Sequence, residues 1–245
     1  MTPAPSVSRP ARSWRRHAAA LLLGLLPLPL SAADLDQQLG WLAWFNSTPV
    51  AEGWSLISDV QLRSADDLDH LRNLLVRGGL SRSLGQGWSL GGGYAYIGTY
   101  SPSAASLTEH RSWQQLLLQR PWGSAQTTQR LRLEQRFIGR AGRSDLYADR
   151  LRYFLRLQQP VAGGSLGEGG VGPYLALQNE LFLQLSARDS LNGQVFDQNR
   201  AYLAAGLRLN RRVDLELGYL NQYLAGRTVD TDNHVIQLAL YTRLP

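Results

Sequence analysis

Alternation of charged and apolar residues with a period of two constrains this chain more than any other feature. Between Arg130 and Phe137, arginine or glutamate occupies every second position, and leucine, glutamine or phenylalanine occupies the positions between. The same alternation recurs over Arg150–Leu157 and over Arg212–Tyr219. Successive side chains point to opposite faces of a strand, whereas helical geometry would spread these charges around the whole circumference. The pattern therefore predicts β-strands with one charged and one apolar face.

Weaker alternation fills the rest of the chain, between turn-forming clusters such as Ser101-Pro102-Ser103 and Asn192-Gly193. No helical segment and no second domain is expected. The predicted strands are Trp54–Arg63, His70–Ser81, Trp88–Ile97, His110–Arg120, Thr128–Ile138, Arg150–Gln158, Tyr174–Leu185, Gln198–Leu209, Arg212–Gln222 and His234–Leu244.

Two all-β folds would use such strands, a soluble sandwich with an apolar core or an outer-membrane barrel with an apolar outer wall and a charged lumen. Strands of about ten residues suit a tilted membrane-spanning strand. Short connections alternate with longer ones, such as Gly98–Glu109 and Gly139–Asp149. Aromatic residues near strand ends or on the apolar face resemble the girdles of a barrel. These are Trp54, Trp88, Trp113, Trp122, Tyr153, Tyr174, Tyr219, Tyr223 and Tyr241. The sequence therefore predicts an antiparallel, up-and-down transmembrane β-barrel.

Loop lengths also give an expectation for the number of strands. If short turns and the last strand end in the periplasm, counting back from Leu244 gives ten strands. The segment Trp41–Asn46 resembles an eleventh strand, but an odd number would leave the N-terminus outside. We therefore expect an even number, about ten or else twelve, with the barrel over residues 54–245. Residues 34–53 then form a periplasmic or luminal segment or an extra strand.

The N-terminus has the three parts of a secretory signal peptide. Arginines at positions 9, 12, 15 and 16 form a basic head, Ala18–Leu30 is an apolar run broken by prolines, and Ser31-Ala32-Ala33 supplies small residues for cleavage. The apolar run is too short to span a bilayer. We expect residues 1–33 to be removed and the mature protein to reside in a bacterial outer membrane.

Composition excludes several classes of function. The chain has no cysteine, which rules out a lipoprotein anchor, disulfides and thiol catalysis. Removal of the four leader arginines lowers the formal net charge from +6 to +2, so the high pI is no sign of nucleic-acid binding. No cofactor is implied, and the expected partners are outer-membrane lipid and the barrel-assembly machinery.

Several motifs, in this order, resemble an uncharacterised family of exported bacterial proteins, the domain-of-unknown-function family numbered 2490. The matching pieces are Gly93-Tyr94 after Trp88, Glu109-His110-Arg111, Trp113-Gln114-Gln115, Arg130–Arg136, Arg150–Tyr153, Asn179–Phe182, Asp197–Arg200 and Glu216–Tyr219. The resemblance implies an outer-membrane barrel and carries no catalytic role. The chain departs from the usual aromatic C-terminus of such barrels, because it ends in Leu244-Pro245.

The charged face supplies the candidate site, a lumen lined by Arg130, Arg132, Glu134, Arg136, Arg150, Arg152, Arg156, Glu180, Arg200 and Glu216. Arginines facing one another across adjacent strands repel, so they need the glutamates on the same face as counter-charges. A narrow barrel is little wider than its side chains. The main expectation is a closed, structural barrel with a salt-bridged lumen of unknown specific role. A small anion-selective pore is the alternative, because surplus arginine focuses positive potential.

The only hint of catalysis is the pair His110 and Ser112, which lie two apart on one strand and so share a face. Outer-membrane lipid hydrolases have a similar local arrangement, so a lipid hydrolase is a further alternative. Glu109 points the opposite way, so no orienting third residue is evident. His70 and His234 are single histidines at strand starts, and no metal-ligand spacing is present.

Overall fold

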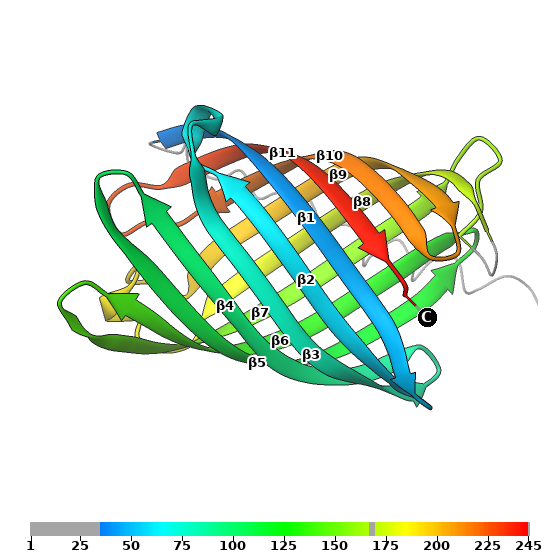
Figure 1. Cartoon of the computed structure of the whole chain (residues 1–245), viewed down its shortest axis with the longest axis horizontal. Helices are drawn as coiled ribbons and strands as arrows, with labels where there is room; N and C mark the ends of the chain where they lie inside the picture. Colours follow the sequence, from blue (N-terminus) through cyan, green and yellow to red (C-terminus); the bar gives the residue numbers. More distant parts are fainter. Residues whose placement is uncertain (1–34, 167–169, 245) are drawn as a thin grey trace, which may run out of the picture. The chain divides into compact units, whose positions relative to one another are not determined.

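The structure is a computed structural model that describes residues 35–166 and 170–244, so the expected signal peptide lies outside the described residues. The described chain forms one closed β-barrel of eleven strands (Figure 1). No helix among the described residues is long and apolar enough to cross a membrane. The strands are β1 (Leu35–Ala51), β2 (Trp54–Ser64), β3 (Leu71–Gly85), β4 (Trp88–Ser101), β5 (Ala104–Trp122), β6 (Ala125–Arg140), β7 (Arg143–Pro160), β8 (Gly172–Gln184), β9 (Phe196–Asn210), β10 (Val213–Leu224) and β11 (Thr231–Thr242).

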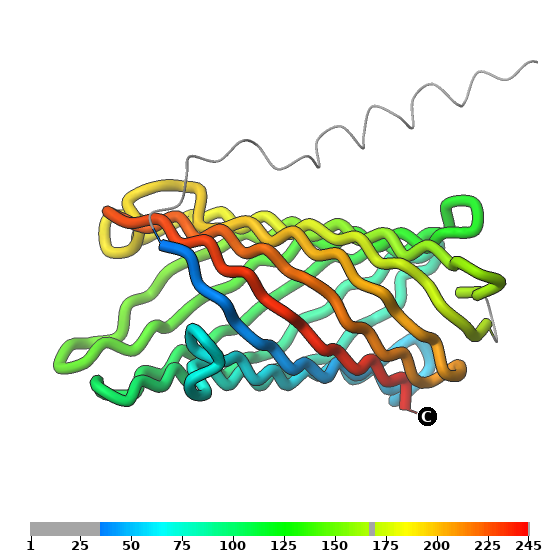
Figure 2. The backbone as a smooth tube through the Cα atoms, turned by 90° about the horizontal axis from the view of Figure 1, so that it is seen from above, coloured from blue at the N-terminus to red at the C-terminus, as the bar shows by residue number. Residues whose placement is uncertain are grey.

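The all-β, barrel-shaped architecture is confirmed, and each of the ten predicted strands has its counterpart in β2 to β11. Each strand pairs antiparallel with the next one along the chain. The ring closes differently, because β1 pairs with β11 in parallel, in a register that joins Leu35 to Thr231 and Asn46 to Thr242. Figure 2 shows the two strands running side by side along the wall. Closure leaves no strand edge unpaired along this seam.

The expected even number of strands is wrong, and the seam gives the reason. Counting assumed that every neighbouring pair is antiparallel, which forces an even number. Because β1 runs in the same direction as β11, the barrel closes with eleven strands, and Leu35 at the start of β1 and Thr242 at the end of β11 lie at opposite ends of the barrel. Residues 34–53, left open by the sequence, lie largely within β1.

The two ends of the barrel differ in their connections. At one end, named here the turn end, four of the five connections have only two residues, and the fifth spans residues 161–171. Gln86 and Gly87 at this end both have positive φ, of 51° and 80°, as two-residue hairpins of type I′ require. The opposite end, named the loop end, carries longer connections over residues 65–70, 185–195 and 225–230.

Two segments that the sequence suggested as long loops are extensions of strands. Within Gly98–Glu109, β4 continues to Ser101 and β5 begins at Ala104, so only two residues turn. Within Gly139–Asp149, Ala141 and Gly142 form the turn between β6 and β7. Glycine, serine and alanine in these segments lowered their strand-like appearance without preventing pairing.

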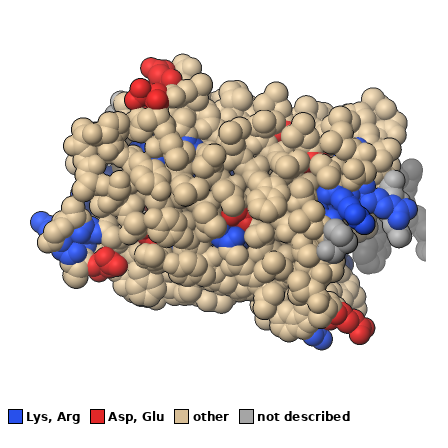
Figure 3. All heavy atoms as spheres, in the orientation of Figure 1, with Lys and Arg blue, Asp and Glu red and all other residues tan. Residues whose placement is uncertain are grey.

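Large apolar side chains cover the outer face of the wall. Exposed residues of this kind include Leu42, Leu56, Val76, Leu90, Leu131, Leu177, Leu203, Leu217, Ile236 and Leu238. Figure 3 shows most of the charged atoms of one face at the two ends of the barrel, with a largely uncharged belt between them.

The aromatic residues expected in girdles divide between the two faces. Trp54, Trp88 and Trp122 are exposed and lie at the turn end, and Tyr153 and Tyr219 are exposed on the outer wall. Three of the other four face the interior, since Trp113 and Tyr174 are buried there and Tyr241 lines an internal cavity. Tyr223 has the outward parity of Tyr219 and is buried near the loop end, where its ring contacts Phe196. Trp113 has the same parity along its strand as Arg111, so its inward direction follows from the alternation itself.

The inward indole of Trp113 occupies space that glycines provide. An added Cβ at Gly79 or at Gly93 would come within 2.5 or 2.7 Å of this ring. Trp113 is 1% exposed and packs in a cluster with Leu75, Ala95 and Ile97. Side-chain packing thus fills the interior near β3, β4 and β5, and a second apolar cluster, which includes Trp41, Tyr202 and Val235, lies inside β1 and β8 to β11.

Candidate functional site

All ten residues expected to line the lumen lie on the interior side of the wall. Seven are buried, namely Arg132, Glu134, Arg150, Arg152, Arg156, Glu180 and Glu216. The other three, Arg130, Arg136 and Arg200, line the internal cavity. Their strands, β6 to β10, are adjacent in the barrel, so alternation along each strand brings the charges into one interior space.

Glu134 is the centre of the largest ion-pair network. Its Oε1 accepts a hydrogen bond from Arg152 Nη1 at 2.6 Å, and its Oε2 accepts from Arg150 Nη2 at 2.7 Å. Arg111 Nη1 lies 3.8 Å from the same carboxylate. Glu134 is 2% exposed, so its charge is compensated almost wholly by these guanidinium groups.

Glu180, on β8, extends the network two strands away from Glu134. Its Oε1 accepts from Arg152 Nη2 at 2.8 Å and from Arg130 Nη2 at 2.7 Å. The guanidinium of Arg152 therefore bridges Glu134 and Glu180. Phe182, fully buried beside them, lies under the guanidinium groups of Arg152 and Arg200, whose Cζ atoms are 4.4 and 4.7 Å from its ring centroid.

Toward the loop end the network continues through two carboxylates that the candidate set did not include. Glu109 accepts from Arg111 Nε and from Arg136 Nε, both at 2.6 Å. Asp197 accepts from Arg150 Nη1 at 2.9 Å. Glu109 faces inward, as its parity relative to His110 predicts, and this parity is the signal that would have identified it.

A second cluster fills the interior toward the turn end. Glu216, fully buried, pairs with Arg156 and accepts a hydrogen bond from the Tyr174 hydroxyl at 2.7 Å. Asp214 pairs with Arg208 Nε at 2.9 Å and with Arg243. Together these side chains close the interior between β7, β8, β9 and β10.

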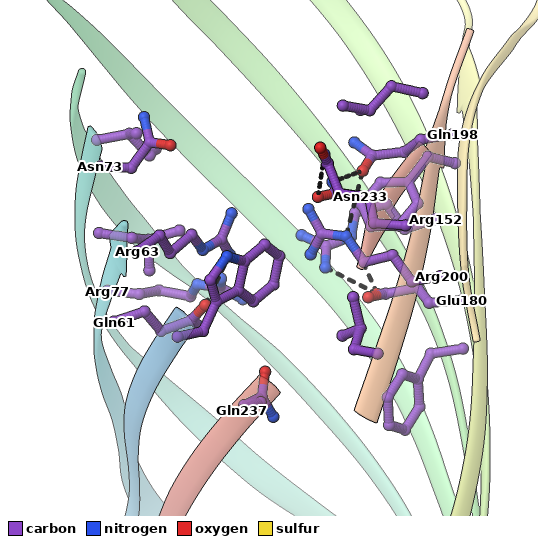
Figure 4. Close-up of a pocket in the computed structure, with 18 of the residues that line it drawn as sticks. Gln61, Arg63, Asn73, Arg77, Arg152, Glu180, Gln198, Arg200, Asn233 and Gln237 are labelled. Atoms are coloured by element: carbon purple, nitrogen blue, oxygen red, sulfur yellow. Dashed lines mark hydrogen bonds and ion pairs between the residues drawn. The ribbon is translucent and has the colours of Figure 1, made fainter. Parts of the chain in front are cut away.

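An internal cavity of about 640 Å³ lies between the central network and the walls formed by β1, β2 and β3. Figure 4 shows Arg63 and Arg77 on one wall, with Arg152, Arg200 and Glu180 on the facing wall. Amide side chains complete much of its lining, at Gln61, Asn73, Gln178, Gln198, Gln222, Asn233 and Gln237.

The arginines of β2 and β3 were missed by the sequence analysis. Arg77 Nε lies 3.3 Å from Asp59, which also accepts from Gln61 at 2.8 Å. Gln61 in turn accepts from Arg63 Nη2 at 2.6 Å. Asp59, Gln61 and Arg63 are spaced two apart, but serine and isoleucine hold the preceding inward positions, which weakened the charged alternation of this strand.

His110 and Ser112 lie on the outer face of the barrel, opposite in direction to Glu109. His110 Nδ1 bonds to the Tyr94 hydroxyl, and its ring also contacts Tyr96. The Ser112 hydroxyl donates to Gln135 Oε1 at 2.8 Å. Within the described part of the chain, no hydrogen bond joins His110 to Ser112, so the structure gives each of them a partner other than its companion.

The seam between β1 and β11 gathers three ligand-bearing residues that sequence spacing did not reveal. Ligand atoms of Asp36, Asp232 and His234 lie within 4.8 Å of one another on the outer face near the loop end. Asp36 and Asp232 are register partners across the parallel pair. Nearly 200 positions separate them along the chain, so only the closure of the barrel brings them together.

Comparisons with known proteins give a family and no activity. The family model described as "Protein of unknown function (DUF2490)" matches residues 38–233. An uncharacterized protein of Methylorubrum extorquens is 26% identical over 233 residues, which cover 93% of this chain and 99% of that protein. No solved structure matches the chain.

Proposed function

The chain belongs to the DUF2490 family of proteins of unknown function, and because that family supplies no activity we propose from the structure that it is a closed outer-membrane β-barrel. It is exported by a cleaved signal peptide, and its ion-paired interior makes it a structural barrel and not a general channel. The observation that carries this proposal is the inverted distribution of polarity between the two faces of one wall.

The outer face is too apolar for a wall surrounded by water. Leucine, valine and isoleucine side chains with exposed fractions of about 40–58% occur on neighbouring strands around the barrel. The carboxylates and guanidinium groups of the central network are buried inside. A soluble barrel would have the reverse arrangement. A bilayer favours an apolar outer face, and a closed ring of strands suits lipid because it satisfies every backbone polar group.

Connection lengths favour an orientation with the turn end in the periplasm. Short periplasmic turns and longer external loops are the rule for bacterial outer-membrane barrels. The exposed tryptophans Trp54, Trp88 and Trp122 then form the girdle at the periplasmic interface. In this orientation the parallel seam places Leu35 at the cell surface and Thr242 in the periplasm.

Cell fractionation and gel mobility test the location. We expect the protein in the outer membrane, with a mature N-terminus near Asp34 and a shift in mobility between unheated and boiled samples. An epitope inserted at Pro102-Ser103 should be accessible on intact cells, and the same epitope at Gly123-Ser124 should not. Recovery as a soluble periplasmic monomer would contradict the proposal.

Conductance separates the closed barrel from an anion-selective pore, which the surplus of interior arginine makes the second candidate. Toward the turn end, buried Glu216 contacts Arg156 and Tyr174 and so fills the interior there. We therefore expect no steady conductance in planar bilayers. Steady anion-selective current that weakens in Arg152→Gln would replace the closed barrel with a pore.

A further inference from the structure

We propose that the internal cavity is a binding site for a small oxyanion, the phosphate or carboxylate group of a polar molecule, held by Arg63 and Arg200. The site goes beyond the closed barrel proposed above. Binding of the anion follows from the cavity itself. Only the side of the membrane from which the anion enters rests on the proposed function.

The first observation is a surplus of positive charge around the cavity. Ten arginines line it, against three carboxylates, Glu109, Glu180 and Asp197. Three more carboxylates, Asp59, Glu134 and Glu216, pair with these arginines from outside the lining. Arg72 is exposed at the rim, so nine guanidinium groups face six carboxylates in the shielded interior, which favours entry of a negative charge.

The second observation is that the surplus is concentrated at Arg63 and Arg200. Among the described residues, no carboxylate oxygen lies within 4.0 Å of a guanidinium nitrogen of either residue. Arg63 donates to the neutral amide of Gln61, and Arg200 donates to the neutral amide of Gln198 at 3.2 Å. Arg150 and Arg152, which also line the cavity, each contact two carboxylates. Arg132, buried on β6 outside the cavity lining, resembles Arg63 in donating to a neutral amide, that of Gln115.

The third observation is that the two arginines converge on one ring. The Cζ atoms of Arg63 and Arg200 lie 4.0 and 5.3 Å from the ring centroid of Trp41. The indole holds the two guanidinium groups in the cavity through cation–π contacts. Figure 4 shows the two arginines reaching into the cavity from different walls.

Donor groups without partners point to the chemistry of the ligand. The Nε–H of Arg63 and the indole N–H of Trp41 are buried and have no hydrogen-bond partner within the described part of the chain. Both residues line the cavity. A buried donor without an acceptor keeps its desolvation cost. Both atoms have almost no surface open to the cavity, so these side chains would shift on binding to reach an oxyanion, whose lone pairs suit the bidentate geometry that guanidinium groups favour.

The dimensions fit a small molecule. A cavity of about 640 Å³ is larger than a bare phosphate requires and falls within the usual range for small-molecule sites. Its lining reaches Ser64, Arg72 and Leu224 at the loop end. The amides of Asn73, Asn233 and Gln237 would then contact polar groups of a ligand that enters from the loop end.

Calorimetric titration of the purified full chain in detergent micelles tests the site. The probes are inorganic phosphate, glycerol 3-phosphate, citrate and, as the uncharged counterpart, glycerol. We expect binding of at least one of the three anions and none of glycerol. Phosphate and glycerol 3-phosphate together identify a phosphate site, and citrate alone identifies a carboxylate site.

Matched variants localise the binding. Arg63→Gln and Arg200→Gln should each weaken it roughly tenfold or more, because a charged hydrogen bond is worth about 1.5–3 kcal/mol and 1.4 kcal/mol corresponds to tenfold. Arg120→Gln, on the exposed outer face near the turn end, should leave affinity unchanged. The heat-dependent mobility shift confirms folding of each variant independently of binding. Absence of anion binding by folded wild type, or equal weakening in all three variants, would overturn the proposal.

Discussion

The interior of this barrel contains two regions that treat buried arginine differently. In the central network, Arg150 and Arg152 each bridge two carboxylates at distances of 2.6–2.9 Å. Beside this network, Arg63 on the facing wall and Arg200 on the same wall contact amides and aromatic rings and no carboxylate among the described residues. The same residue type therefore closes one region and leaves the other with unmatched positive charge.

The difference indicates a separate role for each region. A buried ion pair with good geometry recovers the desolvation cost of its charges and leaves little net potential, which suits a structural filling. Unmatched guanidinium groups do not recover that cost within the protein, so their retention is better explained by a ligand that supplies the missing charge.

The largest effect is expected from the centre of the network. Glu134→Ala removes the carboxylate shared by Arg150, Arg152 and, more distantly, Arg111. Breaking a buried ion pair leaves an uncompensated charge and costs about 3–5 kcal/mol. We expect a fall of that size in the free energy of unfolding, measured by urea titration in lipid vesicles.

Glu52→Ala is the matched control, because Glu52 is exposed in the turn between β1 and β2, and it should change stability by less than about 0.5 kcal/mol. If Glu134→Ala is as stable as wild type, water or ions compensate the network arginines too. The central network would then behave like the cavity, and the comparison would fail.

A smaller effect is expected where packing and not charge fills the interior. In Gly93→Ala the new methyl group would lie 2.1 Å from the Gly78 carbonyl oxygen and 2.7 Å from the Trp113 ring. Overpacking of this kind costs about 1–3 kcal/mol. Gly78→Ala is the control on the adjacent strand, since its methyl group would meet nothing within 4 Å.

Measurements at two salt concentrations add a control to this second test. The loss of unfolding free energy in Gly93→Ala should be the same at low and high ionic strength, because contact between a methyl group and an indole is not screened. A loss in Gly78→Ala equal to that in Gly93→Ala would mean that glycine flexibility, and not space for Trp113, matters at this part of the wall.

The sequence predicted the strands and the inward charges because both depend on a local rule. Alternation with a period of two fixes the direction of every side chain on a strand, so Arg130–Arg136 and Arg150–Arg156 could be assigned to one face from the chain alone. The same rule would have turned Trp113 and Tyr174 inward. Grouping aromatic residues by type and not by parity produced that error.

What the sequence could not predict depends on closure. The parallel pairing of β1 with β11 joins segments nearly 200 residues apart, and no local pattern records the direction of such a pair. For the same reason the convergence of Arg63, from β2, and Arg200, from β9, on Trp41 was beyond prediction. Pairing partners inside a barrel follow from its curvature and strand stagger, which the sequence does not state.

The smallest loss of stability is expected for substitution of the cavity residue Arg200. A small loss at this position is what distinguishes the cavity from the central network. Arg200 and Arg152 both stack on Phe182, at 4.7 and 4.4 Å, so glutamine at either position loses that contact, and at position 200 it also loses the 5.3 Å contact with Trp41. Arg152→Gln also weakens the charge balance of Glu134 and Glu180, and should cost about 1.5–3 kcal/mol. Arg200→Gln removes a buried charge that no carboxylate compensates, so the lost stacking is offset by a smaller desolvation cost. We expect its free energy of unfolding to lie within about 1 kcal/mol of wild type, or above it, in phosphate-free buffer.

Adding a bound anion should then stabilise wild type more than Arg200→Gln, because a ligand stabilises only the state that binds it. Equal losses in the two variants would mean that Arg200 is compensated as fully as Arg152, and the two regions would no longer differ.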